Sequence, residues 1–275
     1  MKILILLAIM GSAFASYSDM QARGQDPKMG SFYLPSDRNV FRNPALLDQG
    51  MNRLYLESEK EAGLKMEDFI IAVDEKKWSA GFKFLNDFGF MAQISPVNGE
   101  GIKYFSATGG WVHNEGVELY GNISSQKISG DDDATSYKIG SVLPMGDYSL
   151  FVEYKGDVDG PKYNNLLLGA SYRHVFVAAP VDFDLTYTNT DDFSGEAKNM
   201  VITASSRHKL TTDFDLLASV NRGVFFSSFT KVNAGLCYHG TKGLQIETAT
   251  SVDPVSKSNP EYGDFNFSLS LSMFI

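Results

Sequence analysis

The chain has 275 residues, of which 43% are hydrophobic, and a formal net charge of −9 at pH 7. This acidic balance argues against binding to nucleic acid, whose phosphates attract Lys and Arg. A mean hydropathy of −0.15 is too polar for a bundle of membrane-spanning helices. It is typical of a transmembrane β-barrel, in which apolar outward residues and polar inward residues alternate.

The beginning of the chain has the pattern of a secretory signal peptide. Lys2 supplies positive charge, an apolar run covers residues 3–10, and a small-x-small cleavage site lies at residues 13–15. We therefore expect residues 1–15 to be removed on export and the mature chain to begin at Ser16. No later stretch reaches the roughly 20 apolar residues of a spanning helix, which leaves a periplasmic, extracellular or outer-membrane protein.

A short segment without alternation precedes the first predicted strand. Asn43 followed by Pro44 favours a turn and the start of a short helix, because proline fits the first helical position. Leu46 and Leu47 would then either plug the opening of a barrel or belong to a capped lead-in to the first strand.

Beyond residue 50, apolar and polar residues alternate with a period of two. The clearest run covers residues 265–275, where Phe, Leu, Met and Ile hold the odd positions and Asn or Ser most of the even ones. This period places the two sets on opposite faces of a strand, and about ten residues suffice for a tilted strand to cross the hydrocarbon layer. Similar runs cover residues 88–95, 165–176, 181–188, 213–221 and 231–239.

These runs and the turns between them give fifteen candidate strands. The candidates begin at Asn52, Asp68, Lys77, Phe88, Ile102, Glu115, Thr135, Asp147, Asn164, Val181, Asn199, Asp213, Lys231, Gly243 and Gly263. A barrel with both termini in the periplasm needs an even number, so one candidate is expected to be wrong. The weakest are 52–57 and 102–112, where alternation breaks.

The predicted fold is all-β. It is a single closed antiparallel transmembrane barrel of fourteen strands, with twelve as the fallback. Expected short connections alternate with longer outer loops, because bacterial barrels have short periplasmic turns and long extracellular loops. The expected division of the chain is a signal peptide at 1–15, a periplasmic plug or lead-in at 16–50, and the barrel at 51–275. The longer loops are expected at 130–134, 157–163, 191–198, 221–230 and 253–262.

The stretch from Asp37 to Leu47 resembles the signature that precedes the barrel in FadL-type outer-membrane transport proteins and their PorV/PorQ-type relatives. In those families an aromatic residue leads into Asn-Pro-Ala-x-Leu just before the first strand. The resemblance implies a fourteen-stranded barrel whose N-terminal segment is folded into its periplasmic mouth. FadL-type transporters are longer and have large ligand-capturing outer loops, which this chain lacks, so uptake of long-chain fatty acids is not expected. The matching residues here are Asn43, Pro44, Ala45 and Leu47.

Charged residues on the polar faces are expected to point into the barrel. Placing Arg or Lys against lipid costs roughly 2–4 kcal/mol each at mid-depth. Either a water-filled pore keeps these residues solvated, or they pair and pack as a closed polar core. The candidate lumen-lining residues are Lys83, Glu118, Glu153, Lys155, Arg173, Asp182, Asp184, Arg207, Lys209, Asp213, Asp215, Lys231 and Glu247.

The sequence offers little sign of catalysis, cofactor or metal binding. The four histidines His113, His174, His208 and His239 have no ligand-like spacing. None of them precedes the Ser-Asn-Gly of outer-membrane phospholipases, and no Asp-His pair accompanies an Asp-Asp pair as in outer-membrane proteases. Cys237 is the single cysteine, so no internal disulfide is expected. The chain is expected not to be an enzyme.

The expected function is passive passage of small solutes, including hydrophobic ones, through a porin-like barrel in the outer membrane of a Gram-negative bacterium. The alternative is a non-transporting structural barrel, such as a PorV-like anchor for secreted proteins. Expected partners are outer-membrane lipid, lipopolysaccharide and a small solute. The alternating last strand, with Phe274 penultimate, resembles the signal read by the barrel-assembly machinery, a further expected partner.

Overall fold

A computed structural model describes residues 37–49, 52–57, 61–74, 77–85, 87–95, 103–113, 115–127, 134–159, 163–175, 180–192, 195–226, 229–253 and 264–274. The expected signal peptide and residues 16–36 lie outside these ranges. Within them, no helix is both long and apolar enough to cross a membrane.

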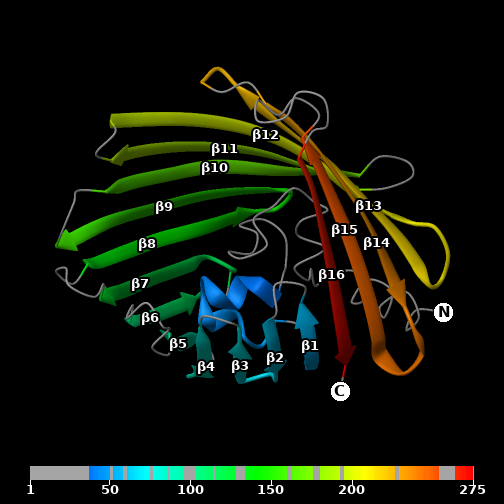
Figure 1. Ribbon diagram of the computed structural model, residues 1–275, viewed down its shortest axis with the longest axis horizontal. Coiled ribbons are helices and arrows are strands. Elements are labelled where there is room, and N and C mark those ends of the chain that lie inside the picture. Colours follow the sequence, from blue (N-terminus) through cyan, green and yellow to red (C-terminus); the bar gives the residue numbers. More distant parts are fainter. Residues whose placement is uncertain are drawn as a thin grey trace.

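Sixteen strands form one closed antiparallel barrel (Figure 1). Every strand pairs with its neighbours in the sequence, and β1 closes the ring on β16. The strands are β1 (Arg53–Glu57), β2 (Glu61–Lys65), β3 (Phe69–Val73), β4 (Trp78–Phe84), β5 (Phe88–Ser95), β6 (Lys103–Val112), β7 (Glu118–Lys127), β8 (Ala134–Met145), β9 (Tyr148–Asp159), β10 (Asn164–Val175), β11 (Pro180–Asp192), β12 (Gly195–Lys209), β13 (Phe214–Val224), β14 (Thr230–His239), β15 (Leu244–Asp253) and β16 (Asp264–Phe274).

The predicted count of fourteen strands, and the fallback of twelve, are wrong. Each of the fifteen candidates corresponds to a strand, including the two weakest, β1 and β6, and the strand that the sequence analysis missed is β2. β2 has five residues, and its outward side chains are Ala62 and Leu64. Two outward residues around Gly63 give too little alternation to be recognised.

One predicted long loop is also wrong. Residues 191–198 are mostly strand, because β11 extends to Asp192 and β12 begins at Gly195. Gly195 adopts a φ of +114°, a conformation that glycine tolerates and other residues rarely adopt, and this permits a tight hairpin. These residues are mostly polar because the ends of β11 and β12 have no apolar face, and for this reason they looked like a loop in the sequence.

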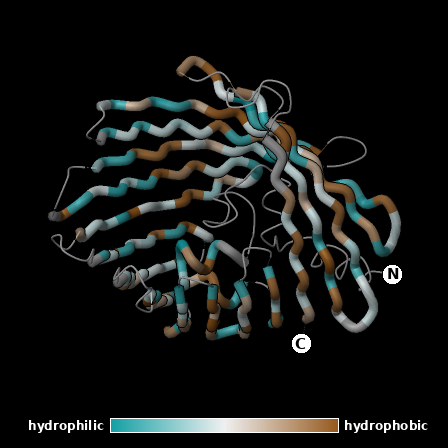
Figure 2. The backbone as a smooth tube through the Cα atoms, viewed as in Figure 1, coloured by the Kyte–Doolittle hydropathy of each residue, from teal (hydrophilic) through white to brown (hydrophobic). Residues whose placement is uncertain are grey.

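The two faces of the barrel wall differ in polarity as the alternation predicted. On β9, Leu150 and Val152 are exposed on the outside, whereas Phe151 and Glu153 are buried on the inside. Bands of apolar and polar residues alternate along the strands in Figure 2. The outside of the barrel is therefore apolar and the inside mainly polar.

The barrel wall is uneven in height. β1, β2 and β3 have five residues each, β4 has seven and β5 eight. The remaining strands have ten to fifteen, and Figure 1 shows these long arrows beside the short ones. We call β1–β5 the short wall. Its seam with β16 consists of five residue pairs, from Arg53–Phe274 to Glu57–Ser270.

A short segment before β1 lies inside the barrel. It contains two 3-10 helices, η1 (Asp37–Phe41) and η2 (Pro44–Leu46). The second helix packs on β4, β5 and β6, and Figure 1 shows both in blue in front of these strands. The contacts lie near the turns that precede β5 and β7, at the rim where β1 begins and β16 ends. We call residues 37–49 the inner segment.

Candidate functional site: the barrel interior

The motif Asn43-Pro44-Ala45 forms the start of η2. Asn43 has an extended backbone, and its side-chain oxygen accepts a hydrogen bond from the Ala45 amide at 3.2 Å. Pro44 then occupies the start of the helix, where its missing N–H costs nothing. Asn43, Ala45 and Leu47 are all at most 1% exposed. This motif, singled out by the resemblance, is thus the part of the inner segment that lies closest to the wall.

Two glycines of the wall make room for this motif. A Cβ atom added at Gly89 would lie 2.1 Å from the carbonyl carbon of Pro44, and one at Gly110 would lie 1.8 Å from Oδ1 of Asn43. Real Cβ atoms do not approach other atoms so closely. The backbones of β5 and β6 therefore receive the inner segment only because these two positions lack side chains.

A buried ion pair holds the inner segment to β7. Nη2 of Arg42 lies 2.8 Å from Oε2 of Glu118, and the Asn43 side-chain amide donates to the same oxygen at 3.3 Å. The Arg42 side chain is 1% exposed and that of Glu118 is 13% exposed. A second pair, at the end of the segment, joins Lys83 Nζ to Asp48 at 2.6 Å.

Apolar contacts complete the docking. Val40, Leu46 and Leu47 form one buried cluster with Ile70 of β3 and Met91 of β5. These wall residues replace the polar side chains that most of the interior carries. The inner segment is therefore bound by an apolar contact, two ion pairs and a close backbone approach, which together specify its position.

Opposite charges are also paired along the rest of the interior. Lys138 lies 3.5 Å from Glu153, which also accepts a hydrogen bond from the Tyr120 hydroxyl at 2.8 Å. Arg173 of β10 contacts Asp182 of β11 at 2.6 Å across directly paired positions. These pairs resemble the closed polar core that was one of the two predicted arrangements.

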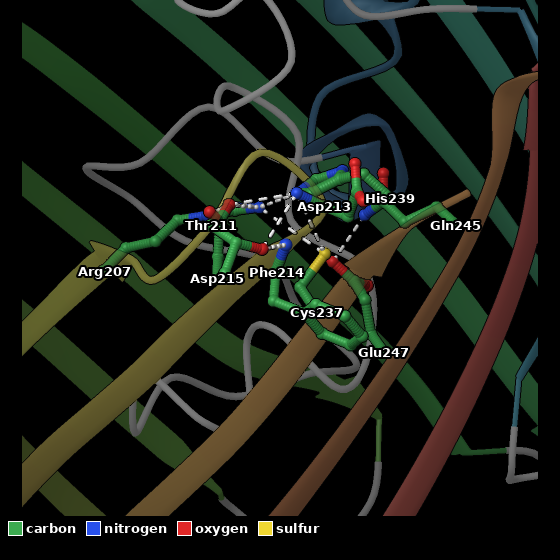
Figure 3. A network of polar contacts seen from close by, with 9 residues as sticks. All are labelled: Arg207, Thr211, Asp213, Phe214, Asp215, Cys237, His239, Gln245 and Glu247. Atoms are coloured by element: carbon green, nitrogen blue, oxygen red, sulfur yellow. Dashed lines mark hydrogen bonds and ion pairs between the residues drawn. The ribbon is translucent and has the colours of Figure 1, made fainter. Parts of the chain in front are cut away.

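A larger polar network is formed by residues of four neighbouring strands, from β12 to β15 (Figure 3). Asp215 contacts Arg207 at 2.8 Å and His239 at 3.0 Å, and Cys237 Sγ lies 3.5 Å from the same ring nitrogen, Nε2 of His239. A nucleophile–base–acid relay needs the thiol and the carboxylate on different ring nitrogens. The network therefore does not have the geometry of a catalytic relay.

Arg207, Asp215 and Glu247 of this network were candidate lining residues, whereas Cys237 and Gln245 were not among the candidates. Asp215, Cys237 and Glu247 are consecutive cross-strand partners on β13, β14 and β15. Gln245 donates to Glu247 at 2.6 Å. The register brings these residues together, and a single sequence does not reveal a register. No group of three His, Cys, Asp or Glu side chains among the described residues is placed to hold a metal ion.

The candidate lumen-lining residues fall into four groups. Lys209 and Asp213 are exposed at the turn between β12 and β13, and Lys155 and Lys231 are half-buried. Lys83, Glu118, Arg173 and Arg207 take part in the ion pairs above. The buried carboxylates are Glu153, Asp182, Asp184, Asp215 and Glu247.

One side of the interior is a neutral polar surface of small residues. Ser205, Ser219, Asn233 and Ser251 are consecutive cross-strand partners from β12 to β15, and Asn233 donates to Ser219 at 2.9 Å. Each of these four is at most 3% exposed. We call this row the hydroxyl belt. Its side chains are short and uncharged, and they are closed off from water in this structure. On the next strand, β16, Ser268, Ser270 and Ser272 lie further toward the end of the chain and are buried as well.

The chain is similar to several solved structures at low sequence identity. No family model and no curated protein match the chain. It is similar to a bacterial polysaccharide outer membrane secretin (TM-score 0.49, 8% identity, 82% of this chain and 98% of that one). It is also similar to a loop-deletion mutant of OmpT, an outer membrane protein of Vibrio cholerae (TM-score 0.47, 8% identity, 82% and 97%). A third similar structure is CdiB from Acinetobacter baumannii (TM-score 0.43, 10% identity). The match covers 81% of this chain and 59% of CdiB. A specific FadL-type or PorV-type relationship is not among these findings.

Proposed function

We propose that this chain is an outer-membrane channel for small polar solutes that the inner segment holds closed. The observation that carries the proposal is the docking of residues 37–49 inside a sixteen-stranded barrel. Barrels of sixteen strands enclose a lumen that wall side chains alone do not fill, and porins of this size hold water there. Departure of the inner segment would therefore free a path along the wall.

The location in the outer membrane is part of this proposal. A closed barrel leaves no unpaired edge strands, and lipid can cover its apolar outer face. The signal-peptide pattern at residues 1–15 supports export. Outer-membrane lipid, lipopolysaccharide and the barrel-assembly machinery are the partners that such a location implies.

The polarity of the interior supports polar rather than hydrophobic solutes. The hydroxyl belt is neutral and polar, although it is buried in the closed state, and the charges nearby are paired in both signs. Strong selection for one sign of charge is therefore not expected. The strand count of sixteen also departs from the fourteen that the FadL-type resemblance implies, so hydrophobic transport does not form part of the proposal.

A non-transporting barrel is the second candidate. The buried, paired interior favours it, because such pairs also suit a barrel that only anchors other proteins at the membrane. The two candidates differ in what happens when the inner segment is removed. A channel would conduct, and a closed structural barrel would not.

Conductance of a truncated chain tests this difference. A chain that begins at Met51 lacks the inner segment and can be refolded into detergent beside the chain that begins at Ser16. In planar bilayers we expect large, steady conductance from the truncated chain and rare openings from the longer one. Heat-modified mobility on gels checks that both barrels are folded. A folded truncated barrel that never conducts would instead support the structural candidate.

A further inference from the structure

We propose that the short wall binds a second copy of this chain side by side in the membrane. Strand height is the first reason. A five-residue strand at the usual tilt rises only about 12 Å, whereas the apolar band of such barrels is about 25 Å tall. β1, β2 and β3 are all of this length. Lipid beside the short wall would have to thin by roughly half, and mismatch of this kind drives association in membranes.

The outer surface of the short wall is the second reason. All outward side chains described on β1–β5 and on the adjoining strand β6 are apolar or aromatic, and they include exposed Trp78, Phe82 and Phe105. Among these described side chains, no charged group has to lose its solvent when another protein covers the surface. A charge on this face would have opposed any apolar contact.

The relief of this surface is the third reason. Ala80, Ala92 and Ala107 are directly paired across β4, β5 and β6, so they form a furrow of small side chains. A ridge of Phe69, Phe82 and Phe90 runs along one side of it. A second ridge runs along the other side and is formed by the paired residues Val73, Trp78, Ile94 and Phe105.

A second copy matches the height of this surface, which an unrelated partner need not do. A two-fold axis along the membrane normal would place the same surface of each copy against the other, as isologous contacts require. Both copies carry the same height deficit, so a single contact hides both from lipid.

A pair of small outward residues on two long strands, β13 and β14, which we call the long wall, provides a comparison. Ala218 and Ala234 are outward cross-strand partners on β13 and β14. These strands have eleven and ten residues, enough to cross the apolar band. Lipid meets that surface without mismatch, and we expect no second copy there.

Cross-linking in lipid vesicles tests the proposal. In a Cys237→Ser background, Ala92→Cys should give a covalent dimer with a short thiol cross-linker, and Ala218→Cys should not. Furrow filling by Ala92→Phe should weaken association roughly tenfold or more, as overpacking of a close contact does. Ala218→Phe, the same change on the long wall, should leave it unaltered.

Single-molecule photobleaching of labelled wild-type chains in vesicles gives the second readout. Two bleaching steps per particle are expected. Single steps at all protein densities, or equal cross-linking through Ala92→Cys and Ala218→Cys, would overturn the proposal. Neither readout depends on whether the barrel conducts, so the channel proposal stands or falls separately.

Discussion

Replacing Gly110 by alanine is expected to open the barrel. The new methyl group would lie 1.8 Å from the side-chain oxygen of Asn43, so the inner segment has to move away from β6. Overpacking of this kind costs about 1–3 kcal/mol, which shifts a docked–released equilibrium by roughly 5- to 150-fold. We expect single-channel recordings of Gly110→Ala to show an open fraction raised by about that factor.

The neighbouring residue offers a matched control. A methyl group at Gly109 would meet no atom within 4 Å, because this position faces outward. Gly109→Ala makes the same chemical change on the same strand without touching the inner segment, and its conductance should equal that of the wild type. Equal conductance of Gly110→Ala and Gly109→Ala would show that contact between the inner segment and β6 does not control the channel.

Loss of the Glu118 carboxylate is expected to release the inner segment even more strongly. Arg42 is 1% exposed at the side chain, and removal of one partner of a buried ion pair typically costs 3–5 kcal/mol. Asn43 loses a hydrogen-bond acceptor in the same change. Glu118→Ala should therefore raise the released population by roughly 100-fold or more.

Thiol labelling measures that release directly. Leu47 is fully buried against the wall, so Leu47→Cys in a Cys237→Ser background should react slowly with a water-soluble maleimide. Adding Glu118→Ala should make it react quickly. Glu196→Ala removes a carboxylate from the exposed pair with Lys198 and serves as the control. Unchanged labelling after Glu118→Ala would mean that this ion pair does not hold the segment.

The face of the wall on which each residue lies was largely predictable from sequence, because the period of two needs no knowledge of distant contacts. Residues 88–95 and 213–221 were assigned to the correct faces by alternation alone. β2 escaped recognition because five residues around a glycine carry too few alternating positions. The strand count therefore failed where the wall is shortest, not where the pattern was misread.

The interior contacts were less predictable, because they depend on register and on residues far apart in the chain. The break in alternation within residues 102–112 looked like a weakness of the strand. In the structure, Gly110 is required by Asn43, which lies far from it in the sequence. Arg173 and Asp182 were both candidate lining residues, but only the register shows that they face each other. Leu46 and Leu47 pack against Ile70 and Met91 inside the barrel, and the choice between a plug of the barrel opening and a capped lead-in stays a prediction.

The inner segment and the short wall share the same strands. Met91 of β5 contacts the inner segment from inside, and its neighbours Phe90 and Ala92 belong to the proposed contact outside. If both proposals hold, pairing of two copies would stiffen the wall on which the inner segment docks. Channel opening would then differ between single and paired barrels, which Ala92→Phe allows to be compared.

Lipid contact on the outer face is the claim on which the whole account depends, and neighbouring residues of β13 test it. Ala218 is exposed on the outside and Ser219 is buried inside. Each is replaced by cysteine in a Cys237→Ser background, labelled with bimane before refolding, and placed in vesicles of brominated lipid. We predict strong quenching at residue 218 and little at residue 219. Equal quenching at the two positions, or a folded protein that stays in solution without detergent, would contradict the account.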